Sequence, residues 1–322
     1  MINSHIIPAF YLELFARPSS RGPRNPGRVW VYEKGREAHD RATSVQGREN
    51  GYFALVRPGG TLEESFETRL AERENECNEI LDFARSELYH WPLGAEEKLA
   101  FYAALLFRRA TQQRTFSNNN WQKIIDDMRQ AAADPEYIRR MAQDLRHKRK
   151  LPVSEDMLRN SITTWIEGAV EPTSARNNFI SDLLELAEQG AGVLLRKSPW
   201  RILRPPEGVE FVTSDNPLVT FVLLGNGVLH PGYGFGREDS DALFPLAPDA
   251  CLLMGKAWNV PNSLDTAQSD ALNDVLINIC DRYAYSKTLS LGIQQRVDQY
   301  GGSARYGVNA FMPLGIKLPL AR

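Results

Sequence analysis

Three polar residues at distant places in the sequence have the types that phosphate chemistry needs: His5, Arg109 and Asp215. His5 stands just before a helix that we predict to start near Pro8, and the positive end of a helix dipole disfavours an imidazolium ion. The neutral ring could then act as a base or as a metal ligand. The alternative is a histidine that only hydrogen-bonds a nearby backbone group.

Arg109 follows an apolar run, FYAALLF, and continues the helical spacing of Leu99, Tyr102 and Leu106. That spacing predicts an arginine that reaches inward from a largely buried helix. A buried guanidinium needs a carboxylate or an anionic ligand. We therefore expect Arg109 to bind either an internal acid or the phosphate of a substrate.

Two carboxylates of a charged segment, Glu67 and Glu74, are seven residues apart and so fall on one helix face. Together with Asp215 they could hold Mg²⁺ or Mn²⁺, because carboxylate oxygens suit such hard cations. The alternative is an exposed acidic stripe paired with Arg69 and Arg73.

The stretch FVTSDNP, residues 211–217, places polar side chains at the end of a predicted strand. Such residues favour tight turns, and Pro217 keeps the preceding residue extended. A ligand site and a plain turn are equally compatible with Asp215. If a site forms, we expect Tyr11, Ser214 and Asn216 to contact the substrate.

These residue types are compatible with phosphodiester hydrolysis. Arg109 would bind the phosphate and His5 would transfer a proton, with or without a metal held by Asp215 and a glutamate. This favours a nuclease, such as a toxin-like or defence effector acting on RNA or DNA. Two alternatives stay open: a non-enzymatic nucleotide- or partner-binding protein with a buried Arg/Asp/Asn network, and a purely structural role for the same residues.

Composition and motifs exclude several other classes. The formal net charge of −2 leaves no global basic field for nucleic acid. A local basic segment, 139–150, is either a solvated helix end or a phosphate-contacting patch. There is no HExxH, P-loop, GxSxG or nucleotide-binding glycine fingerprint. We therefore do not expect a zinc protease of the common type, a P-loop NTPase or an α/β-hydrolase.

The remaining composition favours a cytoplasmic protein. The three cysteines, Cys77, Cys251 and Cys280, are too few and too scattered for a disulfide framework, and we interpret them as core residues. We find no signal peptide, and the longest apolar runs are too short to span a bilayer. We expect no membrane partner, while a nucleic-acid partner stays open.

The chain predicts a single α+β domain over residues 1–322, with a helical middle at about 61–195 and a β-rich part at about 199–322. Segregated helices and strands favour this class. The strand predicted at 28–34 should join the C-terminal strands in a mostly antiparallel sheet, and 51–56 is a second N-terminal strand candidate. The predicted helices are 61–88, 95–117, 121–132, 135–147, 154–168, 174–195 and 263–281, with Thr61 and Glu64 at capping-box spacing.

Several boxes together resemble a widespread bacterial domain-of-unknown-function family. They are His-x-x-Pro-x-x-Tyr-Leu-x-x-Phe at 5–15, Thr-Ser-Asp-Asn-Pro at 213–217, Phe-Pro-Leu-Ala-Pro at 244–248 and Arg-Tyr-Ala-Tyr-Ser at 282–286. The similarity spans 5–286, although Ser4 stands where the family has glutamine and Ala247 where it has serine. The resemblance implies one fold in which the boxes share a site, and it implies no reaction.

Overall fold

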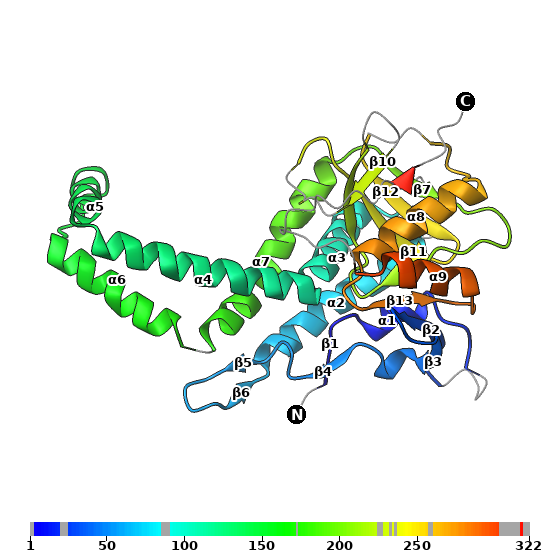
Figure 1. Cartoon of the computed structure of the whole chain (residues 1–322), viewed down its shortest axis with the longest axis horizontal. Helices are drawn as coiled ribbons and strands as arrows, with labels where there is room; N and C mark the ends of the chain where they lie inside the picture. The colour runs from blue at the N-terminus through cyan, green and yellow to red at the C-terminus, as the bar shows by residue number, and fades with distance from the viewer. Residues whose placement is uncertain are drawn as a thin grey trace. The chain divides into compact units, whose positions relative to one another are not determined.

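The structure is a computed structural model of the chain and has the predicted α+β class. It describes residues 3–19, 25–84, 91–171, 173–223, 228–231, 234, 237–256, 260–302 and 316–317. The chain forms two compact units (Figure 1). Unit 1 comprises residues 1–54, 64–113 and 183–322, and unit 2 comprises 55–63 and 114–182. The assignment of residues 1–322 to one domain stays a prediction.

A six-stranded antiparallel sheet forms the centre of unit 1. Its strand order is β14-β10-β9-β11-β12-β7. Strands β11 and β12 are buried along their whole length, as continuous apolar runs predict. The strands are β7 (Trp200–Leu203), β9 (Val219–Leu223), β10 (Val228–Pro231), β11 (Asp241–Ala247), β12 (Ala250–Met254) and β14 (Ile316–Lys317).

A second antiparallel sheet joins the two ends of the sequence in the order β3-β2-β13-β8. It confirms that the strand predicted at 28–34 pairs with the C-terminal third, with Val31 opposite Tyr285. Its strands are β2 (Arg28–Glu33), β3 (His39–Ala42), β8 (Thr213–Ser214) and β13 (Tyr283–Ser286). A short strand, β1 (Asn3–His5), pairs separately with β4 (Arg48–Asn50), and a 3-10 turn, η1 (Thr43–Val45), precedes β4.

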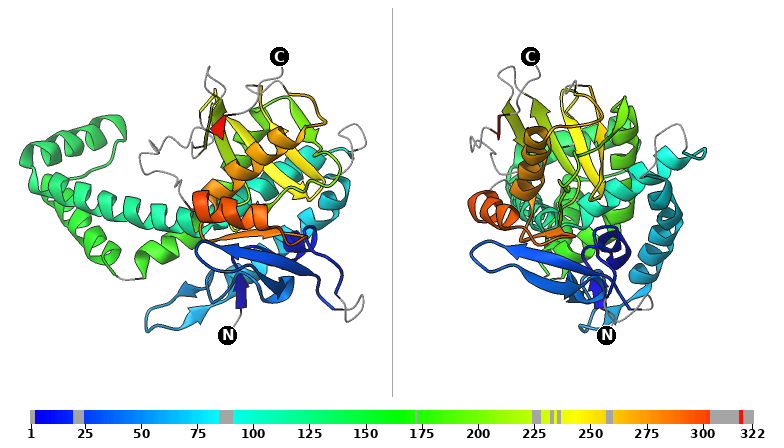
Figure 2. Two further views of the ribbon diagram at one scale, coloured as in Figure 1. Left: turned by 45° about the vertical axis from the view of Figure 1, so that its right-hand side comes forward. Right: turned by 90° about the vertical axis from the view of Figure 1, so that its right-hand side faces the viewer.

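Helices cover these sheets within unit 1. Helix α3 (Ala95–Arg109) is buried over most of its length, as its apolar run requires. Helix α8 (Thr266–Ile279) starts with a capping box from Asp265 and packs on β8, β9, β10 and β14, along one face of the six-stranded sheet (Figure 2). The others are α1 (Ala9–Glu13), α2 (Ser65–Ala84), α9 (Leu291–Tyr300) and, from Leu183 on, α7 (Ser174–Arg196).

Unit 2 is built mainly from helices. It contains α4 (Thr111–Ala133) from Arg114 on, α5 (Pro135–Lys148), α6 (Glu155–Ala169), the start of α7, and a hairpin of β5 (Leu55–Val56) and β6 (Leu62–Glu63). Asp134 and Ser154 cap α5 and α6 by accepting from backbone N–H groups of the first turn. A small core holds the two helices together through Ile138, Ala142, Leu158 and Ile162.

Two sequence predictions of helix boundaries are wrong. The helix predicted at 95–117 ends at Arg109, because Ala110 adopts an extended backbone (φ −55°, ψ 140°), and α4 then runs through the separate helix predicted at 121–132. The capping box of Thr61 and Glu64 does not form, because the chain there turns through the β5–β6 hairpin and α2 begins at Ser65. The last residues of the helix predicted at 61–88, residues 85–88, lie outside the described ranges.

The three cysteines are buried and unpaired, as expected for core residues. Burial raises the pKa of Cys77 to about 11 and raises the pKa values of Cys251 and Cys280 far above the usual range. None is therefore a thiolate at neutral pH.

Of the helices within the described ranges, none combines the length and apolar character that crossing a bilayer requires.

Candidate functional site

Arg109 reaches inward and finds a protein carboxylate. Its Nη1 forms an ion pair with Glu74 of α2, and its Nη2 donates to the backbone oxygen of His5. The guanidinium carbon also lies 4.9 Å from the ring centre of Phe53. Burial lowers the pKa of Arg109 to about 9, while Glu67 opposes the fall, so the side chain stays charged at neutral pH. The predicted inward orientation is thus confirmed, with an internal acid as its partner.

Glu67 connects strand β1 to helix α2 beside Arg109. Its Oε1 accepts from the hydroxyl of Ser4 and from the backbone N–H of Phe53, the latter at 3.2 Å. Ser4 is buried and takes the place where the resembling family carries glutamine. We call the group of Ser4, His5, Glu67, Glu74 and Arg109 the Arg109 cluster.

His5 lies at the edge of the Arg109 cluster and is half-buried. Its Nε2 lies 3.0 Å from Nε of Arg48 and 3.2 Å from the backbone oxygen of Ser44. Burial lowers the pKa of His5, and the charges of Arg48 and Arg109 lower it further. The ring is therefore neutral at pH 7.

This lowered pKa predicts a loss of stability in acid. Below its ordinary pKa of about 6.5 the unfolded chain protonates His5 while the folded chain does not, so the free energy of unfolding falls as pH decreases through that value. His5→Gln should lose less stability than the wild type between pH 7.5 and pH 5.5 in urea unfolding. An identical pH dependence of the two proteins would contradict the placement of His5.

Asp215 binds three consecutive backbone N–H groups. Its carboxylate accepts from the backbone N–H groups of Asp281, Arg282 and Tyr283, at 2.7, 2.8 and 2.9 Å. Burial raises the pKa of Asp215 to about 7, with Asp281 adding to the rise and the three N–H donors opposing it. Asp215 thus holds the backbone that leads from α8 into β13.

The neighbours of Asp215 strengthen the same junction. Asn216 donates from Nδ2 to the backbone oxygen of Ile279 at 3.3 Å, and its own N–H donates to Oγ of Ser214 at 3.2 Å. Gln112 donates to the same Ile279 oxygen at 3.1 Å. We call Gln112, Ser214, Asp215 and Asn216 the Asp215 cluster. It satisfies carbonyl groups at the C-terminus of α8 that the helix itself cannot bond.

Tyr11 joins three of the sequence boxes in the core. Its hydroxyl donates to the backbone oxygen of Pro245 at 2.7 Å and lies 2.8 Å from the hydroxyl of Thr213. Its ring stacks on Phe244, with ring centres 5.6 Å apart and planes at 10°. The side chain is fully buried, and burial raises its pKa. Tyr11 therefore locks α1 to β8 and β11.

The structure brings four of the eight predicted site residues together and gives the other four different partners. His5, Glu67, Glu74 and Arg109 form one cluster, whereas Asp215 contacts neither His5 nor Arg109 within the described residues. In the same part of the chain, no group of three or more His, Cys, Asp or Glu side chains is placed to hold a metal ion. The shared metal at Asp215, Glu67 and Glu74 stays a prediction, and so do the substrate contacts of Tyr11, Ser214 and Asn216.

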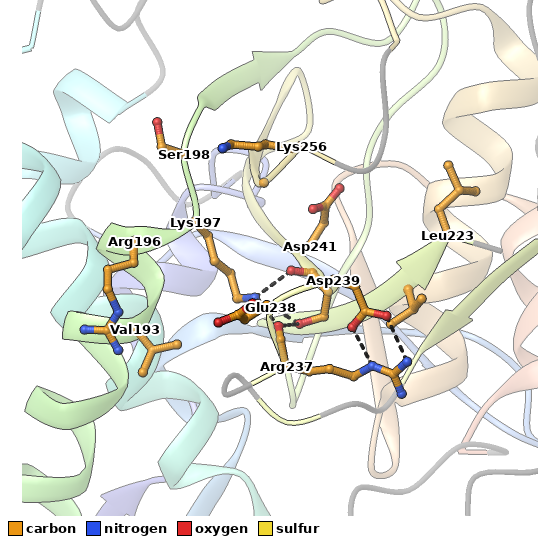
Figure 3. A pocket seen from close by; sticks show the side chains of 13 residues that line it. Val193, Arg196, Lys197, Ser198, Leu223, Arg237, Glu238, Asp239, Asp241 and Lys256 are labelled. Carbon is orange, nitrogen blue, oxygen red and sulfur yellow. Dashed lines mark hydrogen bonds and ion pairs between the residues drawn. The ribbon is translucent and has the colours of Figure 1, made fainter. Parts of the chain in front are cut away.

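A pocket of about 680 Å³ in unit 1 was not foreseen from the sequence. Figure 3 shows Lys197 at its centre, with its ammonium directed toward the loop before β11. Nζ donates to the backbone oxygens of Arg237 (3.0 Å) and Ser240 (2.5 Å) and to Oγ of Ser240 (2.9 Å). The pocket residues come from α7, β9, the loop 237–240, β11 and the end of β12, so no local motif signals them.

Unit 2 carries a group of exposed basic side chains along α5 and just after it. We call it the basic surface. All six of its side chains are exposed, and one of them, Lys148, is in an ion pair, with Asp144. Nε of Arg146 donates to the backbone oxygen of Ala142. The members are Arg139, Arg140, Arg146, Lys148, Arg149 and Lys150.

Comparison with known proteins defines a family and no activity. No curated protein and no solved structure matches the chain. A family model described as "Protein of unknown function (DUF4238)" matches residues 3–290. This range contains the Arg109 cluster, the Asp215 cluster, the pocket around Lys197 and the basic surface. The chain therefore belongs to the DUF4238 family.

Proposed function

We propose that this protein binds nucleic acid through the basic surface of unit 2. The observation that carries the proposal is an excess of exposed, largely unpaired cations at residues 139–150 in a chain whose net charge is −2. Arginine, which supplies four of the six cations, binds phosphate with two parallel N–H groups. From Arg139 to Lys148 the helix rises about 14 Å. A DNA duplex presents about eight phosphate charges over that length.

Stabilisation of the helix does not account for all of these cations. Positive charges complement a helix dipole only in the last turn, which here contains Arg146 and Lys148. Arg139 and Arg140 lie near the start of α5, where the dipole gives them no such benefit. Their exposure without an ion pair in the described structure supports contact with an external anion.

Lys150 supports the proposal through its backbone. It has a φ of +56°, in the left-handed region that glycine adopts most easily after a helix. The N–H of Leu151 donates to the backbone oxygen of Leu145 and closes the turn around it. A lysine at this position costs about 1–2 kcal/mol relative to relaxed backbone geometry, which favours a role for its charge.

The apolar side chains of α5 favour nucleic acid over a membrane surface. A helix that lies in a bilayer interface needs an exposed apolar face. In α5, Ile138 and Ala142 are buried against Leu158 and Ile162 of α6, and Leu145 packs against the same core. The exposed face therefore offers charge and no apolar anchor.

Cleavage of the bound strand is not part of this proposal. The charged N–H groups of Arg109 face Glu74 and the His5 carbonyl, so binding a phosphate would break a buried ion pair. The contacts of Asp215 and Tyr11 likewise support the structural interpretation of the boxes. A nuclease that uses His5, Arg109 and Asp215 stays a prediction. Incubation of labelled RNA and DNA with Mg²⁺, Mn²⁺ or EDTA tests it, comparing the wild type with His5→Ala.

Charge reversal in the basic surface should weaken nucleic-acid binding by at least about tenfold, because four phosphate contacts are lost. Fluorescence anisotropy with a labelled 20-base-pair DNA and the matching single strands measures it. The test variant is Arg139→Glu, Arg140→Glu, Arg149→Glu and Lys150→Glu. The control carries the same charge change at exposed cations of unit 1, namely Lys34→Glu, Arg41→Glu, Arg69→Glu and Lys287→Glu.

The control should lose less affinity for DNA than the test variant. General repulsion affects both proteins equally, and only the test variant also loses phosphate contacts. Equal weakening of the two would contradict a localised surface. Absence of wild-type binding to DNA or RNA at low salt would overturn the proposal. So would binding to phosphatidylserine vesicles in preference to every oligonucleotide.

A further inference from the structure

The geometry points to a binding site for a small phosphorylated ligand of nucleotide size in the pocket around Lys197. This site lies in unit 1 and does not rest on nucleic-acid binding by unit 2. The pocket volume of about 680 Å³ falls in the range of sites that enclose a drug-sized or nucleotide-sized molecule. Three observations define the chemistry of its occupant.

The first is a buried ammonium without an ion-pair partner. Lys197 donates to three oxygens, and three donated hydrogens require the protonated amine. All three acceptors are uncharged, and among the described residues no carboxylate lies within 4 Å of Nζ. Asp241 and Asp239 act electrostatically on this ammonium, which is one of the four cations that line the pocket.

The second observation is a pair of cations on the rim. Arg196 at the end of α7 and Lys256 after β12 are exposed, and neither makes an ion pair within the described structure. Figure 3 shows them on either side of Lys197. A phosphate group carries close to two negative charges, and fixed cations of this kind bind it with charge-assisted hydrogen bonds.

The acidic residues of the pocket offset part of this charge, because three carboxylates line it together with four cations. Asp239 is occupied by Arg237, which donates from Nε and Nη2 at 2.6 and 2.8 Å. Asp241 is buried beside Gly255 and stabilises the charges of Lys197 and Arg201. Glu238 is the remaining exposed acid, so the open part of the pocket keeps an excess of positive charge.

The third observation is an apolar wall. Val193, Val222 and Leu223 line the pocket beside the charged groups. Inorganic phosphate would leave this wall unused, whereas an organic body such as a base or sugar would cover it. The two kinds of surface together favour a phosphate ester over a free inorganic ion.

Calorimetric titration of the full chain tests the site. The probes are the four ribonucleoside 5′-monophosphates and ribose 5-phosphate, with adenosine, inorganic phosphate and succinate for comparison. At least one phosphate ester should bind more tightly than inorganic phosphate, and adenosine and succinate should bind weakest. Arg196→Ala with Lys256→Ala should weaken the best ester by at least about tenfold, the loss expected for two charge-assisted contacts.

The rim residues are exposed, so these substitutions leave the fold intact. Lys197→Met removes the hydrogen bonds that hold Arg237 and Ser240, so it is a secondary test. The control pair Lys34→Ala with Arg41→Ala should bind like the wild type. The charge-reversed basic surface should also keep ester binding, which separates this site from nucleic-acid binding. The inference is overturned if no ester binds at millimolar concentration, if succinate binds best, or if the rim variant binds like the wild type.

Discussion

Replacing Arg109 by alanine should lower the free energy of unfolding by about 3–5 kcal/mol, the usual cost of removing one partner from a buried ion pair. Glu74 would keep its charge in a buried position, and the carbonyl of His5 would lose its donor. Urea unfolding at pH 7 measures the loss. The exposed Arg69 of α2, replaced by alanine, provides the control and should change stability by less than about 0.5 kcal/mol.

A double substitution separates the ion pair from simple packing. Arg109→Met with Glu74→Met removes both charges and keeps most of the volume, so it should cost less than Arg109→Ala alone. A loss below about 1 kcal/mol for Arg109→Ala would contradict the buried pair. A double variant that is less stable than Arg109→Ala would show that the charges themselves stabilise this cluster.

Asp215→Ala should cost about 2 kcal/mol or more, because three backbone N–H groups lose their acceptor, two of them partly buried, and a buried unsatisfied group costs about 1–3 kcal/mol. Asp215→Asn keeps one oxygen as an acceptor and should lose less. Thermal and urea unfolding measure both, with the exposed Glu37→Ala as the control. A stability of Asp215→Ala equal to the wild type would contradict the junction between α8 and β13.

The raised pKa adds a pH signature to this comparison. The folded chain holds a proton on Asp215 up to about pH 7, whereas the unfolded chain releases it near pH 4. The contribution of Asp215 to stability therefore falls as pH rises from 4 to 7. Asp215→Asn lacks this titration, so its disadvantage relative to the wild type should shrink over the same range.

The fold was predictable where local signals agreed. The predicted helices at 135–147 and 154–168 match α5 and α6 because Asp134 and Ser154 provide N-caps before amphipathic segments. The break at Ala110 was not predictable, since alanine favours helix and no proline or glycine is near. The hairpin at 55–63 was missed for a related reason: Thr61 and Glu64 have the spacing of a helix start but flank strand β6.

The candidate site was predictable in part. Helical spacing correctly placed Arg109 inside, whereas the contacts of Tyr11 with Thr213 and Pro245 were not predicted. Spacing could not show that Asp215 serves backbone groups 66 to 68 residues away, because that depends on how α8 ends. The pocket around Lys197 was hidden for the same reason, since its residues meet only after the sheet has formed.

The salt dependence of DNA binding tests the central claim most directly. Each phosphate neutralised on a duplex contributes about −0.9 to the slope of log K against log salt. Wild type and a variant with alanine at 139, 140, 149 and 150 are titrated with the same 20-base-pair DNA from 50 to 200 mM salt. We expect a steep wild-type slope that becomes shallower by about 3 to 4 in the variant. Equal slopes for the two proteins would contradict it.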